Sequence, residues 1–136
     1  MAKVHKTQSF DVPADEMWAL IGDFHGMHKW AQGLEPSVAS EDGKSRTFKI
    51  GPNAMVETLL EAAERSYSYA LTEGPMPVEN YRSTLSVTEA GDAKCTVDWI
   101  GEFDVPDGMP EEQAIQVVEM VYGGGLDGMA KAISSH

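Results

Sequence analysis

Polar and apolar residues alternate along the start of the chain and then take on a helical spacing. The period of two over residues 3–10, with Val4 and Phe10 on the same face, predicts a partly exposed strand. Pro13 has the backbone angle of an early helical position, and the broad apolar stripe that follows it predicts a helix from about residue 13. Gly22 interrupts this stripe, and a second short helix is expected over residues 24–30.

The rest of the chain shows three hairpin patterns followed by one long helical pattern. Turn signals separate runs of strand-like residues, so we expect an antiparallel sheet of about seven strands. The turns are at residues 41–44, 63–65 and 90–92. The first hairpin has Val38 in one strand and Phe48 and Ile50 in the other, and the later strands cover residues 55–62, 66–72, 78–89 and 93–104. The helix covers about residues 110–134. Without an internal repeat or a linker, residues 1–136 are expected to form one α+β domain.

Alternation within residues 78–89 predicts which side chains face the interior. Tyr81 and Ser83 share the inward face. Counting back from the turn at residues 90–92 places Ser83 opposite Trp99 and Tyr81 opposite Gly101, where the missing side chain would leave room for the phenol ring. Tyr81, Ser83 and Trp99 are therefore expected to form one patch.

Three consecutive glycines, Gly123 to Gly125, interrupt the long helical pattern. Each glycine costs up to about 1 kcal/mol of helix stability relative to alanine, so we expect an offsetting role. One interpretation is space or a bend beside a cavity mouth, with Tyr122 and Leu126 available to a ligand. The other is close packing of the helix on Trp18 or on the sheet.

Composition and charge exclude several classes of function. The chain has 22 acidic and 10 basic residues, so its formal net charge of -12 disfavours nucleic acid and anionic membranes. Its one cysteine, Cys95, excludes a disulfide framework and favours a core thiol. With neither a secretory signal pattern nor a stretch of about 18 apolar residues, the expected location is the cytoplasm.

The order of these elements, together with several short motifs, resembles the SRPBCC or START-like superfamily. This superfamily includes polyketide cyclase/dehydrase and lipid-transport proteins and birch-pollen-allergen-like proteins. The resemblance covers essentially the whole chain. It is carried by residues 12–14, Trp18, residues 22–24, Trp30, residues 57–59, residues 80–83 and residues 99–106.

The resemblance implies a helix-grip fold, in which a curved seven-stranded antiparallel sheet wraps around the C-terminal helix and leaves a cavity. Similarity to plant abscisic-acid receptors at residues 80–83 and 104–108 places Glu57, Tyr81 and Ser83 toward that cavity. The gate pattern of these receptors is not evident here, and we do not assign the chain as a hormone receptor. The expected ligand-binding residues are Trp30, Phe48, Met55, Glu57, Tyr69, Tyr81, Ser83, Trp99, Tyr122 and Leu126.

Buried polar groups favour a ligand contact, because an unpartnered one costs about 1–3 kcal/mol. The competing interpretation is that Tyr81 and Trp99 only fill the core while Glu57 pairs with a neighbouring basic residue. His25 and His28 are three residues apart, but no further metal ligands accompany them, so we expect a solvated or helix-capping pair and no metal. No phosphate loop or nucleophile elbow is present, and no cofactor is expected.

Three hypotheses for function remain. The first is binding or transport of a small hydrophobic or aromatic molecule, lipid-like or polyketide-like, in the cavity. The second is a cyclase, aromatase or dehydratase-like enzyme in which His28, Glu57 or Tyr81 transfers a proton. The third is a protein-interaction module. The sequence does not decide whether the chain is an enzyme, and it leaves the oligomeric state open.

Overall fold

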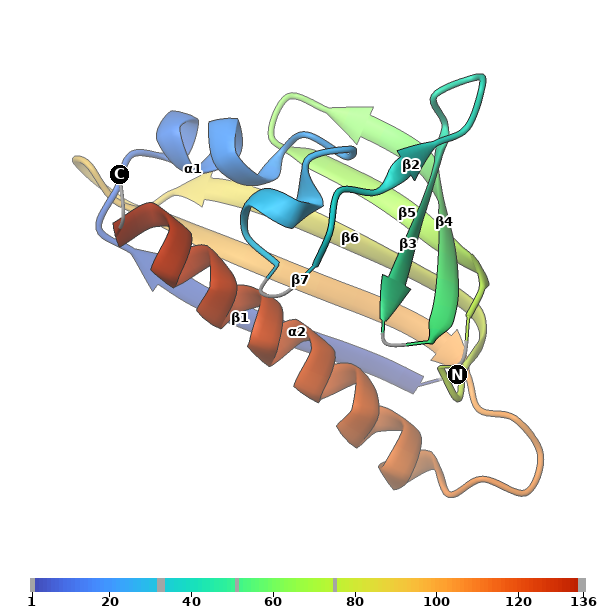
Figure 1. The fold of residues 1–136 in the computed structure, drawn as a ribbon. Coiled ribbons are helices and arrows are strands. Elements are labelled where there is room, and N and C mark those ends of the chain that lie inside the picture. Colours follow the sequence, from blue (N-terminus) through green and yellow to red (C-terminus); the bar gives the residue numbers. More distant parts are fainter. Residues whose placement is uncertain (1, 32–33, 51, 75, 135–136) are drawn as a thin grey trace.

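The structure is a computed structural model that describes residues 2–31, 34–50, 52–74 and 76–134. One long helix, α2, crosses a curved sheet, and a short helix, α1, lies at one end of it (Figure 1). The elements in chain order are β1 (Ala2–Phe10), α1 (Ala14–Ile21), the 3-10 turn η1 (Met27–Lys29), β2 (Val38–Ala39), β3 (Ser45–Ile50), β4 (Asn53–Ala63), β5 (Ser66–Glu73), β6 (Glu79–Glu89), β7 (Cys95–Asp104) and α2 (Glu111–Ser134).

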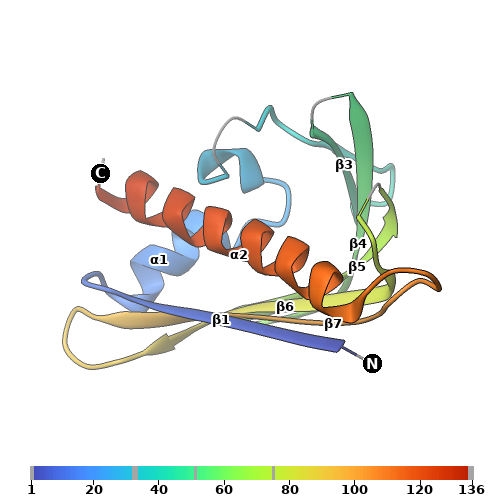
Figure 2. The same cartoon turned by 90° about the horizontal axis from the view of Figure 1, so that it is seen from below.

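The seven strands form one antiparallel sheet in the order β1-β7-β6-β5-β4-β3-β2. Figure 2 shows that β1, β7 and β6 form a floor beneath α2, while β3 and β4 rise from it as a wall. Register shifts between Val56 and Glu57 and between Leu59 and Glu61 accompany this change of direction in β4, as bulges increase the local bend of a strand. The predicted α+β helix-grip architecture is confirmed.

Alternation along the central strands produces the buried face that α2 covers. In β6 the buried side chains are every second residue from Tyr81 to Val87, and in β7 they alternate from Cys95 to Phe103. The facing stripe of α2 is buried at Ala114, Val118, Tyr122, Leu126, Gly128 and Met129. Burial of apolar area between these two surfaces, at about 25 cal/mol per Å², holds the helix on the sheet.

The predicted register between β6 and β7 is wrong by two residues. Ser83 lies opposite Gly101, and Leu85 lies opposite Trp99. The reason is that β6 and β7 are connected by a five-residue loop, which is flanked by the paired residues Glu89 and Cys95. Ala93 in this loop has a φ of 54°, outside the strand region, and β7 begins at Cys95 instead of the predicted residue 93. Side chains alternate with a period of two, so a shift of two residues leaves every side chain on its expected face.

The predicted second helix over residues 24–30 is reduced to the single 3-10 turn η1. Gly26, directly before η1, and Trp30, directly after it, have non-helical backbone angles. Within the described part of the chain, no helix is long and apolar enough to cross a membrane.

Candidate functional site

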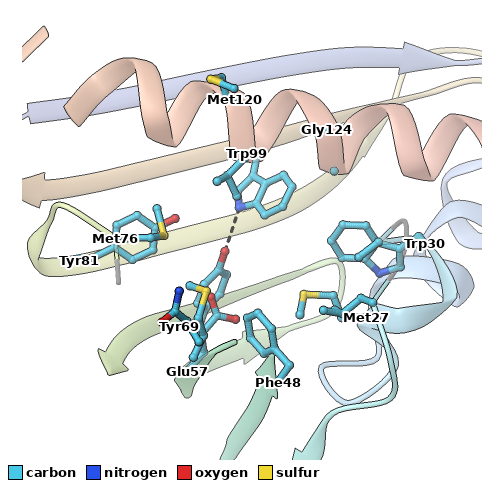
Figure 3. Close-up of a pocket in the computed structure, with 16 residues that line it drawn as sticks. Met27, Trp30, Phe48, Glu57, Tyr69, Met76, Tyr81, Trp99, Met120 and Gly124 are labelled. Atoms are coloured by element: carbon cyan, nitrogen blue, oxygen red, sulfur yellow. Dashed lines mark hydrogen bonds between the residues drawn. The ribbon is translucent and has the colours of Figure 1, made fainter. Parts of the chain in front are cut away.

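A pocket of about 440 Å³ lies between α2, the segment around η1 and the concave face of the sheet (Figure 3). Most of its lining side chains are apolar or aromatic. They are Met27, Trp30, Ala31, Leu34, Phe48, Asn53, Met55, Glu57, Tyr69, Met76, Tyr81, Trp99, Met120, Val121, Gly124 and Gly125. Met120 and Val121 are 76% and 43% exposed, so the pocket opens to solvent beside this part of α2.

Trp99 in the pocket wall packs against two other aromatic rings. Its ring stacks on Tyr122 of α2 with centroids 4.4 Å apart and planes 8° apart. Trp30 meets it edge-on at 5.7 Å and 73°, which is a favourable geometry for two aromatic quadrupoles. The Trp99 indole N–H also donates to the Tyr69 hydroxyl at 3.1 Å, as drawn in Figure 3. The wall that contains Trp99 is therefore preorganised.

An ion pair lies beneath this aromatic wall. Arg46 on β3 and Glu57 on β4 are directly opposite each other, and both are buried. The Arg46 Nε and Nη2 atoms lie 2.8 and 2.6 Å from Oε1 of Glu57, and its Nη1 donates to the Phe24 carbonyl at 2.6 Å. The guanidinium also lies 4.1 Å from the Phe24 ring centroid and 5.2 Å from that of Tyr69. Arg46 is thus enclosed by the protein, whereas Glu57 lines the pocket.

Burial and pairing act in opposite directions on these two charges. Burial raises the pKa of the Glu57 carboxyl, and the charge and hydrogen bonds of Arg46 partly offset that rise. For Arg46, burial lowers the pKa, but Glu57 and the nearby Tyr67 and Tyr69 outweigh it, so the net pKa is raised. The guanidinium therefore stays charged, and Glu57 is the group whose protonation is sensitive to its surroundings.

A second polar network ties α2 to the sheet behind the pocket. The Tyr122 hydroxyl lies 2.8 Å from the Ser83 hydroxyl and is also hydrogen-bonded to the Tyr81 hydroxyl. Gly101 makes this possible, because a Cβ at that position would clash with the Tyr122 hydroxyl. The space that the sequence predicted at Gly101 thus accommodates the ring of Tyr122, and the prediction that it accommodates Tyr81 is wrong.

The phenols in and behind the pocket all have raised pKa values. Burial is the main cause for each, and it places the pKa of Tyr69 and of Tyr81 well above 10. Burial also raises the pKa of Tyr122 to about 12, against the opposing effect of its bonds to Ser83 and Tyr81. At neutral pH these hydroxyls are protonated, so they can donate hydrogen bonds but cannot act as bases.

Seven of the ten side chains predicted to contact a ligand line the pocket, namely Trp30, Phe48, Met55, Glu57, Tyr69, Tyr81 and Trp99. Ser83, Tyr122 and Leu126 are buried and do not line it. Ser83 and Tyr122 act on the pocket indirectly, through Tyr81 and through the ring stacked on Trp99. Trp18 also lies outside the pocket, with its ring 5.9 Å from that of Tyr67.

The glycines of α2 combine the two roles considered for them. The helix is continuous through Gly123, Gly124 and Gly125. A Cβ on Gly125 would overlap the Trp99 ring and would lie 3.3 Å from Trp30, so this position allows close packing on the sheet. Gly124 lines the pocket, and a Cβ there would have no atom within 4 Å. Gly124 therefore leaves space at the mouth.

His28 on η1 is half-buried and does not line the pocket. Its Nδ1 atom is buried without a hydrogen-bond partner, while Nε2 of His25 bonds the Gly43 carbonyl at 2.8 Å. Across the described residues there is no group of three or more His, Cys, Asp or Glu side chains that could hold a metal ion.

Arg46 is the basic partner that one interpretation of the sequence expected for Glu57, but the sequence analysis did not name it. It lies two positions before Phe48 on the same strand, so the period of two places it on the inward face, directly opposite Glu57. This even spacing from Phe48 is the signal in the sequence that could have identified Arg46. The flexible side chains of Met27, Met76 and Met120 were also missed, because they come from a turn, a loop and the exposed side of a helix, where alternation gives no guidance.

Comparisons with known proteins show the family and the fold of the chain. Residues 1–134 match the model of the family described as polyketide cyclase / dehydrase and lipid transport. No curated protein matches the chain. Among solved structures, the protein XoxI from Bacillus cereus is 29% identical with a TM-score of 0.90, over 97% of this chain and 95% of that one.

Two more distant structures share the fold. A START superfamily protein from Mycobacterium smegmatis is 16% identical with a TM-score of 0.71, over 98% of this chain and 94% of that one. The di-domain ARO/CYC BexL from the BE-7585A biosynthetic pathway is 15% identical with a TM-score of 0.82. It is matched over 98% of this chain and 47% of its own length. Both likenesses concern the architecture alone.

Proposed function

Because the chain belongs to the polyketide cyclase/dehydrase and lipid-transport family, we propose that it binds a small hydrophobic or aromatic molecule between α2 and the sheet. The observation that carries this proposal is the pocket of about 440 Å³ with a mostly apolar and aromatic lining. Pockets that enclose small ligands have this size, this composition and few polar groups. The protein would act as a carrier or a store for its ligand.

The state of the polar groups supports binding over catalysis. The tyrosines that line the pocket are protonated at neutral pH, and the Glu57 carboxylate is bonded to Arg46. A general base needs a free acceptor of suitable pKa within reach of the substrate proton. Glu57 is the candidate that retains such capacity as a base, so it carries the second proposal, a cyclase or dehydratase-like activity. In that proposal the protonated Tyr81 would act only as a general acid. His28 is set aside from that proposal because it lies outside the pocket lining.

The test of binding uses native mass spectrometry of protein purified without denaturation, followed by titration with the neutral probe N-phenyl-1-naphthylamine. We expect a specific copurified molecule or saturable probe binding. Gly124→Leu should weaken probe binding at least about tenfold, since its side chain would fill the mouth, whereas Gly123→Leu should not.

Equal binding by both leucine variants would show that the probe sits elsewhere. Absence of any bound molecule across a broad aromatic and lipid panel would refute the proposal. Analysis of the released molecules by liquid chromatography and mass spectrometry separates the two candidate functions. A molecule that has lost water would support a dehydratase, and one of unchanged mass but altered retention would support a cyclase; Glu57→Gln should then reduce turnover more than affinity.

A further inference from the structure

The polar groups that border the pocket differ in what they leave available to a ligand. The indole N–H of Trp30 is buried without a hydrogen-bond partner and can donate to an acceptor on a ligand, and Asn53 also lines the pocket. Trp99 already donates to the Tyr69 hydroxyl, and the Tyr81 hydroxyl is bonded to Tyr122. Arg46 uses Nε and Nη2 on Glu57 and Nη1 on the Phe24 carbonyl. Arg46 is 1% exposed and is not among the lining residues, and aromatic rings lie over its guanidinium, so the cation does not face the pocket.

Glu57 is different, because both of its contacts with Arg46 are made by one oxygen. Oε1 receives Nε and Nη2, so Oε2 keeps its acceptor capacity. Glu57 lines the pocket, where Figure 3 shows it beside Tyr69 and Phe48. A donor group on a ligand can bond to this oxygen without displacing any bond within the protein.

The charge balance of the pair restricts the ligand further. One positive and one negative charge at 2.6 Å leave the pocket wall close to neutral. A carboxylate or phosphate on the ligand would meet Glu57 before Arg46 and would lose its hydration in an apolar site. The net charge of -12 on the whole chain adds to this repulsion.

Resting on the proposed function, we propose that the pocket selects neutral, hydroxyl-bearing hydrophobic molecules. In this arrangement the ligand hydroxyl donates to Oε2 of Glu57, and its apolar body lies against Trp99, Trp30 and Phe48. Arg46 is a positioning residue that holds the carboxylate in place. A site built to receive a hydroxyl discriminates strongly against analogues that lack it, since the polar group of the site is then left unpaired.

Three probes of similar size test this selection by isothermal titration calorimetry at neutral pH: 1-naphthol, 1-methoxynaphthalene and 1-naphthoate. We expect 1-naphthol to bind at least about tenfold more tightly than 1-methoxynaphthalene, and 1-naphthoate to bind most weakly. Equal affinity for the naphthol and its methyl ether would overturn the proposal while leaving the proposed function intact. Tightest binding of the naphthoate would also overturn it, because Arg46 would then be accessible. If none of the three binds although another molecule of the aromatic and lipid panel does, this inference is overturned and the proposed function stands. If nothing in that panel binds, both are overturned.

Variants test whether the Arg46–Glu57 pair is responsible for the preference for 1-naphthol. Glu57→Gln alone leaves a buried unpaired cation, so the informative protein is the double variant Arg46→Met/Glu57→Leu, which replaces the pair with apolar groups. It should bind both neutral probes with nearly equal affinity. Tyr69→Phe removes a pocket hydroxyl and keeps the pair. It should lower the affinity for both neutral probes, because the Trp99 indole N–H loses its acceptor, but it should leave the ratio of naphthol to ether affinity unchanged. Loss of the preference in Tyr69→Phe but not in the double variant would assign the selection to Tyr69 and contradict the proposal.

Discussion

Arg46 and Glu57 place two full charges among the rings of Phe24, Phe48 and Tyr69. Removing two ions from water costs several kcal/mol each, and their attraction compensates for this only with good geometry and additional hydrogen bonds. The bond to the Phe24 carbonyl and the cation-π contacts supply the additional interactions on the arginine side. The pair is therefore held together by its surroundings, and removal of one member should be far more costly than removal of both.

Arg46→Met should destabilise the protein in a pH-dependent way. Without the arginine, only burial acts on Glu57, so its pKa in the folded state rises further above the ordinary value of 4.5. A raised folded pKa gives stability that is fully present below the unfolded pKa and is lost as the pH rises through the folded pKa. We expect a loss of about 3–5 kcal/mol at about pH 8, and a smaller loss at about pH 5. Urea unfolding followed by circular dichroism at both pH values measures it.

The double variant Arg46→Met/Glu57→Leu is the control for this pH dependence. It has no carboxyl at position 57. The difference in unfolding free energy between this variant and the unsubstituted protein should therefore not grow between about pH 5 and about pH 8. A loss in Arg46→Met that is the same at both pH values would mean that Glu57 is not the titrating group.

At the scale of elements, the three glycines of α2 lower its intrinsic helix stability, and only Gly125 gains close packing on the sheet in return. Gly123→Ala should stabilise the protein by about 0.5–1 kcal/mol, since nothing lies within 4 Å of the new Cβ and alanine is the better helix former. Gly125→Ala should instead destabilise it by about 1–3 kcal/mol, because the methyl group would displace Trp99. Chemical unfolding of the two variants compares them directly.

The near-UV circular dichroism of the same samples provides an independent check. Gly125→Ala should alter the tryptophan signal by disturbing the stack of Trp99 on Tyr122, whereas Gly123→Ala should leave it unchanged. A stabilising Gly125→Ala would contradict the packing described for Trp99 and Trp30.

Strands and the long helix could be predicted from the sequence because their buried faces repeat with fixed periods. The register of β6 on β7 could not, because it depends on the loop from Ala90 to Lys94, where alternation stops. Pocket residues on central strands, such as Tyr81 and Trp99, were predicted from the same alternation and the family resemblance. Arg46 was missed because a charged residue is almost never fully buried unless it is paired, and the pairing across β3 and β4 appears only in the folded sheet.

At the scale of the whole molecule, the net charge of -12 opposes compactness. Raising NaCl from about 10 mM to about 150 mM shortens the Debye length from about 30 Å to about 8 Å, which weakens this self-repulsion. We expect a gain of about 1 kcal/mol, or about 3–5 °C in Tm, measured by differential scanning calorimetry. At a pH near the sequence pI of about 4.5, the gain should disappear. A Tm that falls with salt at neutral pH would mean that exposed ion pairs such as Lys6–Glu119 outweigh the repulsion.

The edge strands of the sheet, β1 and β2, influence how readily the protein can aggregate. An unpaired strand edge is a template for pairing with another chain, and long, flat, apolar edges are the most dangerous. β2 has only two residues, which is too short for a stable cross-molecule ladder. β1 has nine residues, but Lys3 and Lys6 place positive charges along it. The fold thus keeps an open apolar pocket while giving a neighbouring copy little opportunity to extend the sheet into a fibril.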